Sequence, residues 1–190
     1  KLLYAATAAS SLGLFIPFVH LAPYARDHGL SGAAGAWLVA LIGVGSTVGR
    51  FVLGGTADRL GRRRSLMVMF AGMGLALLWW TVAVDLWSLA LFALLFGVCY
   101  GGFVALIPAL TADYFGGRSA GAIIGLLYTS VALGTLAGPW LAGRIYDLQA
   151  SYGLPIVAGA LANGIALGCL AVLAEPARWR AGRCGRGRAG

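Results

Sequence analysis

The feature that most constrains this chain is a series of long stretches without a charged side chain. Residues 86–112 and 148–174 contain no Asp, Glu, Lys, Arg or His, and residues 66–84 are equally free of them. About 20 apolar residues in helical conformation are enough to cross the ~30 Å hydrocarbon core of a bilayer. The chain is 60% hydrophobic and 11% charged, whereas a soluble domain carries about 25% charged residues. We therefore expect an integral membrane protein.

The apolar stretches predict an all-α membrane protein with six transmembrane helices. Uninterrupted apolar runs favour helices, because the strands of a membrane barrel alternate apolar and polar residues. The connections between the runs are too short for a second domain, so residues 1–174 should form one six-helix bundle, followed by a basic tail at 175–190. The expected spans are residues 2–25, 31–54, 65–84, 86–112, 119–143 and 154–174.

Lysine and arginine are concentrated on one side of the expected bundle. If the connection 55–64 is cytoplasmic, that side holds 11 of them, and the opposite side holds only Arg26 and Arg144. The positive-inside rule then places both ends of this chain in the cytoplasm. We expect a location within a membrane and the lipid bilayer as a partner. The net charge of +8 then reflects topology and anionic lipid headgroups, and we expect no nucleic-acid partner, although a basic tail can in principle bind RNA.

The start of the chain, its cysteines and its few polar residues within the spans each allow a simple expectation. The chain begins at Lys1 without a cytoplasmic leader, which suggests a fragment whose N-terminal part is missing. Cys99 and Cys169 lie in expected spans and Cys184 lies in the tail, which is no pattern for a disulfide framework or a metal site. An intramembrane enzyme would need clustered His, Glu, Asp or Cys within the spans. We expect no enzymatic activity, no cofactor and no metal.

Two halves of the chain resemble each other weakly. The second expected helix begins with the sequence SGAAGA and ends in GGTAD, and the fifth begins with SAGAIIG and ends in GRIYD. Both ends are displaced by 88 to 89 residues. Because three crossings separate the two copies, they run in opposite directions through the membrane. This arrangement predicts a 3+3 inverted repeat, an architecture of secondary transporters that bind substrate near the membrane midplane.

A charged motif, GGTADRLGRRR at residues 54–64, follows the second expected helix. It resembles the G-x-x-x-D-R-x-G-R-R-R loop of the major facilitator superfamily, which joins the second and third helices of a six-helix half. The resemblance implies a cytoplasmic gating loop that breaks and re-forms its contacts as two halves rock. The alternative is that its arginines only fix the topology. The residues that match the motif are Gly54, Asp58, Arg59, Gly61, Arg62 and Arg63.

A narrower resemblance extends over residues 15–174. Residues 15–31, 41–66 and 114–147 look like the C-terminal half of bacterial monocarboxylate transporters, which implies a bacterial inner membrane as the location. This resemblance implies half of a twelve-helix transporter, whose N-terminal six-helix half is a missing partner. It further implies proton-coupled symport of a small organic anion, a monocarboxylate, by alternating access. Residues 134–143 also resemble a signature of drug/proton antiporters, so an exporter of drugs or metabolites is an alternative, as is a six-helix protein that does not transport.

Arg50 is the expected substrate-binding residue. A charged side chain inside a span is costly and usually faces a cavity or a partner. Ser46, one turn earlier, and Thr47 offer polar groups beside it, and the planar guanidinium suits two-point binding of a carboxylate. The resemblance agrees, since the family has an anion-binding arginine in this helix, although its mammalian members carry an aspartate where this chain has Ser46. The alternative is that Arg50 only extends to the cytoplasmic interface.

Aromatic residues and a histidine complete the candidate site. Tyr100 and Phe103 on the fourth expected helix and Tyr128 on the fifth could wall a substrate cavity, although such a stripe is also typical of core packing. His20 is the proton-coupling candidate, because an imidazole titrates near physiological pH and Pro17 should loosen its helix. In straight helices His20 and Arg50 would lie about 20 Å apart. His20 could therefore serve an outer gate, or be an ordinary interfacial histidine.

Overall fold

The computed structural model describes residues 1–174 and their side chains, except those of residues 53, 54, 56, 58, 117 and 118. The described part is all-helical, as predicted, and the tail predicted at 175–190 lies outside it. Its helices are α1 (Leu2–Leu14), α2 (Ile16–Asp27), α3 (Gly32–Leu60), α4 (Arg62–Trp80), α5 (Leu86–Phe115), α6 (Gly117–Gln149) and α7 (Gly153–Val172).

Five helical segments among the described residues are long and apolar enough to cross a membrane. The first of these segments, Leu2–Asp27, combines α1 and α2, and the others lie in α3, α5, α6 and α7. The remaining helix, α4, begins with three consecutive arginines that lower its mean hydropathy. It nevertheless lies within the bundle, packed against α5 and α7. The six expected spans therefore correspond to six helical segments, with α1 and α2 as one.

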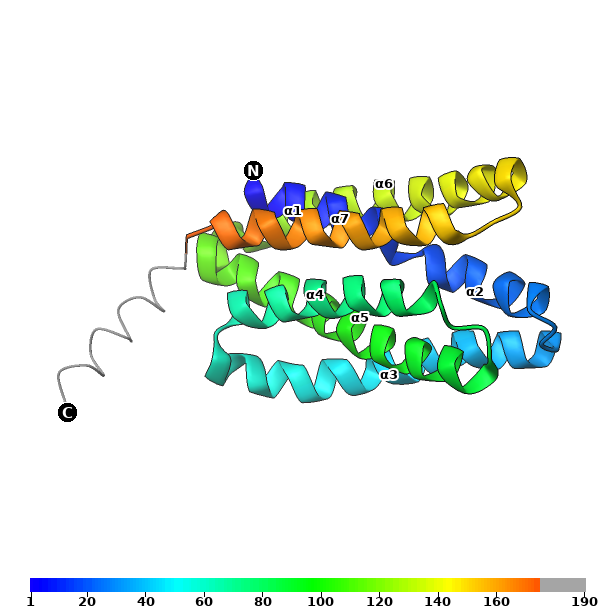
Figure 1. Ribbon diagram of the computed structural model, residues 1–190. Helices are drawn as coiled ribbons and strands as arrows, with labels where there is room; N and C mark the ends of the chain where they lie inside the picture. Colours follow the sequence, from blue (N-terminus) through cyan, green and yellow to red (C-terminus); the bar gives the residue numbers. More distant parts are fainter. Residues whose placement is uncertain (175–190) are drawn as a thin grey trace.

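The helices lie side by side along one direction, and successive connections alternate between the two ends of the bundle (Figure 1). One end, here called the basic end, holds the N-terminus, the turns α3–α4 and α5–α6, and the end of α7. Its charged residues include Lys1, Arg59, Arg62, Arg63 and Arg64. The opposite end, here called the far end, holds the connections α2–α3, α4–α5 and α6–α7, together with Arg26 and Arg144.

The first span is broken in the middle. Helix α1 ends at Leu14 and α2 begins at Ile16, with Phe15 between them at φ −99° and ψ −2°. Pro17 occupies the second position of α2. Its ring has no N–H to donate and clashes with the carbonyl four residues earlier, which interrupts a continuous helix. The sequence predicted that Pro17 loosens this helix, and the structure shows a break two residues before it, where Phe15 and Phe18 are half-buried.

Two connections between helices are shorter than the sequence pattern predicts. Helix α3 continues to Leu60, so most of the expected loop 55–64 is helical and Gly61 alone separates α3 from α4. Gly61 has a φ of +92°, a conformation that glycine adopts without strain. Helix α6 likewise continues to Gln149 through the expected connection 144–153. Neither extension contains a proline, and a helix pairs its own backbone groups inside or outside the hydrocarbon region.

Close crossings through glycine repeat across the two halves of the fold. Gly45 and Gly49 of α3 face carbonyl oxygens of α5, and Gly134 and Gly138, each 89 residues later, face α1. A Cβ added at Gly45 would lie 2.5 Å from the Leu94 carbonyl oxygen. Small residues let helix backbones approach in membranes. The matching crossings support the 3+3 inverted repeat expected from the sequence.

Helix α1 is also held by buried hydrogen bonds between side chains. Thr7 Oγ1 lies 3.0 Å from Ser130 Oγ of α6, and Ser10 Oγ donates to Asn163 Oδ1 of α7 at 2.8 Å. All four residues are buried. Hydroxyl and amide groups in a membrane core need such partners, because water is absent there. These bonds fix the position of α1 against the two later helices.

Candidate functional site

Four residues from different elements gather around Tyr100, and we call the five residues together the Tyr100 cluster. Tyr100 lies on α5, where its ring packs against Phe15 at the α1–α2 break (centroids 6.2 Å apart) and against Phe18 of α2 (5.3 Å). Arg50 of α3 and Tyr128 of α6 both lie close enough to act electrostatically on the Tyr100 hydroxyl. The cluster therefore joins the broken first span to α3, α5 and α6.

The close crossing of α3 and α5 brings Arg50 and Tyr100 together. Gly101, next to Tyr100, faces the backbone carbonyl of Ser46, one turn before Arg50. No side chain larger than hydrogen fits at this contact. The glycine thus allows the α5 backbone to lie directly against α3, which leaves the adjacent Tyr100 ring beside the turn that carries Arg50.

Arg50 and Tyr128 are exposed on the surface of the bundle, whereas Tyr100 and the two phenylalanines are half-buried. A guanidinium among aromatic rings can bind a carboxylate with two parallel N–H···O bonds while the rings contact the attached carbon chain. The cluster thus combines the cation and the apolar walls that binding a small organic acid requires.

Ser46, Thr47 and Phe103, the other residues predicted for substrate binding, are not part of the Tyr100 cluster. Ser46 is 5% exposed at the α3–α5 contact, and its hydroxyl has no hydrogen-bond partner among the described residues. Thr47 is exposed and donates to the Gly43 carbonyl of its own helix at 3.1 Å. Phe103 is 3% exposed and packs in the core against Phe70, so it is away from the exposed side of the cluster. The predicted aromatic stripe is divided between cluster and core.

His20 lies away from the Tyr100 cluster. Its Nε2 is 3.0 Å from the Pro139 carbonyl oxygen of α6, and its ring centroid is 5.3 Å from that of Tyr152. A carbonyl oxygen only accepts hydrogen bonds, so Nε2 carries the proton of this bond. The side chain is 8% exposed. The structure therefore separates the proton-coupling candidate from the residues predicted to bind substrate.

Two arginines of the predicted gating loop, Arg62 and Arg63, are bound within this bundle. Arg62 forms an ion pair with Asp113 of α5 at 2.9 Å and also donates to the Ala109 carbonyl. Arg63 donates to the Leu170 and Ala171 carbonyls at the end of α7. The side chain of Asp113 is fully buried. Arg59 is exposed, and the side chains of Gly54 and Asp58 lie outside the described residues.

Sequence reasoning missed several of these residues. Phe15 and Phe18 carried a weak signal in the sequence, because one phenylalanine lies on each side of Pro17. Asp113 carried none, because an aspartate at the end of an apolar run reads simply as the boundary of a span. Among the described residues, no group of three or more His, Cys, Asp or Glu is placed to hold a metal ion.

Comparison with known proteins shows which family this chain resembles. The model of the Major Facilitator Superfamily matches residues 2–183. Monocarboxylate transporter 12-B of Danio rerio is 35% identical over 144 residues, which cover 74% of this chain and 30% of that protein. The human Monocarboxylate transporter 12 is 34% identical, over 71% of this chain and 27% of its own length.

A fungal relative is also similar. The Aspyridones efflux protein of Emericella nidulans is 29% identical over 138 residues, which cover 72% of this chain and 28% of that protein. The chain thus spans about a third or less of the length of these three relatives. They come from animals and a fungus, so the bacterial inner membrane expected from the sequence stays a prediction.

Proposed function

Because this chain belongs to the major facilitator superfamily, we propose that it forms a six-helix half of a membrane transporter and that the Tyr100 cluster is its part of the substrate site. The observation that carries the proposal is Arg50, an exposed cation on the surface of the bundle, near enough to Tyr100 to act electrostatically on its hydroxyl and one turn from the close contact of Gly101 with Ser46. A second six-helix half would cover this surface and exclude water from it. Exclusion of water strengthens the attraction between a guanidinium and a carboxylate.

The substrate class that fits this surface is a small organic anion, a monocarboxylate. Arg50 supplies the two-point fork for the carboxylate, and Phe15, Phe18 and Tyr100 supply aromatic area for a short carbon chain. Two relatives are named monocarboxylate transporters, which supports this class. A neutral substrate would leave Arg50 without a counter-charge in a dry site, at a cost of several kcal/mol.

We further propose proton-coupled symport by alternating access, with His20 as the group that takes the proton. Its Nε2–H is bound to the Pro139 carbonyl, so an added proton would bind at Nδ1. Pro139 lies in α6, and a change in this bond would couple protonation to movement of α6 against α2. In this proposal the basic end is cytoplasmic, as the positive-inside rule requires.

Uptake into proteoliposomes tests the proposal. The transporter encoded by the whole coding region that contains this chain should take up labelled lactate saturably when a proton gradient is imposed. Arg50→Ala should abolish saturable uptake, and Arg50→Lys should raise KM. Arg144→Ala, which removes an exposed cation at the far end, should have little effect. Normal uptake by Arg50→Ala would refute the assignment.

A control on the half-transporter idea uses residues 1–190 alone. Saturable uptake by this chain would contradict the need for a second half and would point to a homodimer.

Export is the second candidate function. One relative is named an efflux protein, and residues 134–143 contain the Gly/Pro pattern of antiporters. Export and symport predict opposite responses to the same proton gradient. If an acidic exterior drives substrate out of loaded liposomes instead of into empty ones, the exporter replaces the symporter as the function.

A further inference from the structure

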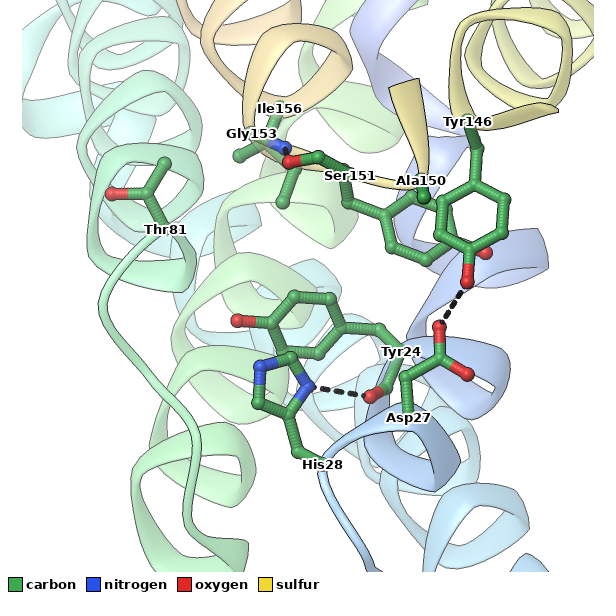
Figure 2. Close-up of a pocket in the computed structure, with 10 residues that line it drawn as sticks. Tyr24, Asp27, His28, Thr81, Tyr146, Ala150, Ser151, Gly153 and Ile156 are labelled. Carbon is green, nitrogen blue, oxygen red and sulfur yellow. Dashed lines mark hydrogen bonds between the residues drawn. The ribbon is translucent and has the colours of Figure 1, made fainter. Parts of the chain in front are cut away.

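A pocket of about 400 Å³ lies at the far end, between α2, α4, α6 and α7 (Figure 2). Its lining residues include Tyr24, Asp27 and His28 of the first span and Tyr146 and Tyr152 near the α6–α7 connection. None of them belongs to the Tyr100 cluster. The volume is within the range of small-molecule sites, which is about 300–1,000 Å³.

Aromatic rings form much of the wall of this pocket. Tyr24 and His28 are stacked with ring centroids 4.2 Å apart, and Tyr146 and Tyr152 form a second stacked pair at 4.2 Å. The ring centroids of Tyr24 and Tyr152 are 5.9 Å apart, so the two pairs adjoin. The four rings therefore adjoin one another along the wall of the pocket.

Backbone groups hold these rings in place. The Tyr24 hydroxyl donates to the Ala83 carbonyl at 3.0 Å, and His28 Nδ1–H donates to the Tyr24 carbonyl at 2.9 Å. Tyr152 is 7% exposed. The rings are therefore fixed before any ligand arrives, which reduces the conformational entropy that binding would cost.

The charged group that lines the pocket is a carboxylate. Asp27 Oδ2 accepts a hydrogen bond from the Tyr146 hydroxyl at 2.7 Å (Figure 2). This bond uses one of the oxygens and leaves Oδ1 as an acceptor. Asp147 and Arg26 also act electrostatically on Tyr152, but neither lines the pocket. The charge within the pocket is negative when His28 is neutral.

We propose that this pocket binds a small organic cation, of the alkylated ammonium class, between its aromatic rings and the Asp27 carboxylate. An ammonium ion is attracted to the electron-rich faces of aromatic rings, and cages of such rings recognise quaternary ammonium groups. Asp27 supplies the counter-charge. An anion would be repelled by the same carboxylate, which distinguishes this site from the carboxylate site at Arg50.

Choline and its uncharged isostere 3,3-dimethylbutan-1-ol provide a direct test. The two have the same shape and differ in the positive charge. We would measure their binding to residues 1–190 in lipid nanodiscs by titration calorimetry. Choline should bind at least tenfold more tightly than the alcohol. Equal affinities, or no binding of choline, would overturn the proposal.

Matched variants locate the site. Asp27→Asn should weaken choline binding about tenfold, whereas Asp85→Asn should leave it within twofold. Asp85 also lies at the far end, but it caps α5 by accepting from Trp87 and Ser88 N–H groups, and asparagine caps a helix nearly as well. Tyr152→Leu should abolish binding and Tyr152→Phe, which keeps the ring, should retain it. If Asp27→Asn and Asp85→Asn weaken binding equally, or if Tyr152→Phe folds but loses choline, the proposal is wrong.

Discussion

Gly45 provides a sharp test of how α3 and α5 pack. A Cβ at this position would lie 2.5 Å from the Leu94 carbonyl oxygen and 3.1 Å from the Gly97 Cα, both of which are backbone atoms of α5. A side chain could rotate away from such a contact, but backbone cannot. Gly45→Ala therefore requires the helices to separate by about 1 Å to reach an ordinary contact of about 3.5 Å.

The size of the effect follows from comparison with Gly43 on the same helix. A Cβ at Gly43 would meet no atom within 4 Å. Both substitutions gain the same helix propensity, about 1 kcal/mol relative to glycine. Only Gly45→Ala adds the overpacking cost, about 1–3 kcal/mol. The two variants should differ by that amount in free energy of unfolding, with Gly43→Ala as stable as the wild type or more so.

Unfolding of residues 1–190 in mixed micelles, followed by tryptophan fluorescence as the fraction of denaturing detergent rises, measures this difference. Gly134→Ala, at the repeat-related crossing of α6 with α1, should behave like Gly45→Ala, because its Cβ would lie 2.5 Å from the Ser11 Cβ. Equal stabilities of Gly43→Ala and Gly45→Ala would refute the close crossing and the inverted repeat built on it.

Two further predictions concern stability at the two ends of the bundle. Asp113→Asn should destabilise the chain by about 1–3 kcal/mol in the same assay, because it removes the charge-assisted bond between Arg62 and a buried carboxylate; a loss no greater than that of Asp85→Asn would contradict this. The pKa of Tyr152 is raised from 10.0 to about 12, mainly because the hydroxyl is buried and to a smaller extent because Tyr146 and Asp27 lie nearby. As the pH rises from 10 to 12, the Tyr152 hydroxyl loses its proton in the unfolded chain before it does so in the folded chain. The wild type should therefore lose up to about 2–3 kcal/mol more stability over this range than Tyr152→Phe. Parallel pH profiles of the two proteins would refute the raised pKa of Tyr152.

Much of the fold could be predicted because a bilayer leaves few alternatives. Long apolar runs must form helices there, and Pro17 lacks the N–H of a continuous helix. Proline alone does not fix a break, however, because Pro23, Pro108 and Pro139 lie inside unbroken helices. The ends of α3 and α6 could not be predicted in this way. Charged and polar residues such as Arg59 and Asp147 mark where a helix leaves the hydrocarbon region, but they do not end the helix.

The candidate site could be predicted only in part, for a related reason. Helical spacing places Tyr100 and Phe103 near one face of α5, yet the tight α3–α5 crossing leaves Tyr100 beside Arg50 and buries Phe103 against Phe70. That division depends on the contact of Gly101 with α3, and the spacing of residues along one helix does not show which neighbouring helix it contacts. The Asp27–Tyr146 bond joins residues 119 positions apart and left no pattern in the sequence.

The central claim is that Arg50 binds the carboxylate of the substrate, and ligand protection against thermal unfolding tests it most directly. In the whole transporter that contains this chain, a bound acid at 100 times its Kd should add about 2.7 kcal/mol to the free energy of unfolding. We predict that lactate raises the Tm of the wild type, raises it less in Arg50→Lys, and leaves Arg50→Ala unchanged, while lactamide protects none of them. Equal protection of wild type and Arg50→Ala by lactate, or equal protection of the wild type by lactate and lactamide, would contradict the claim.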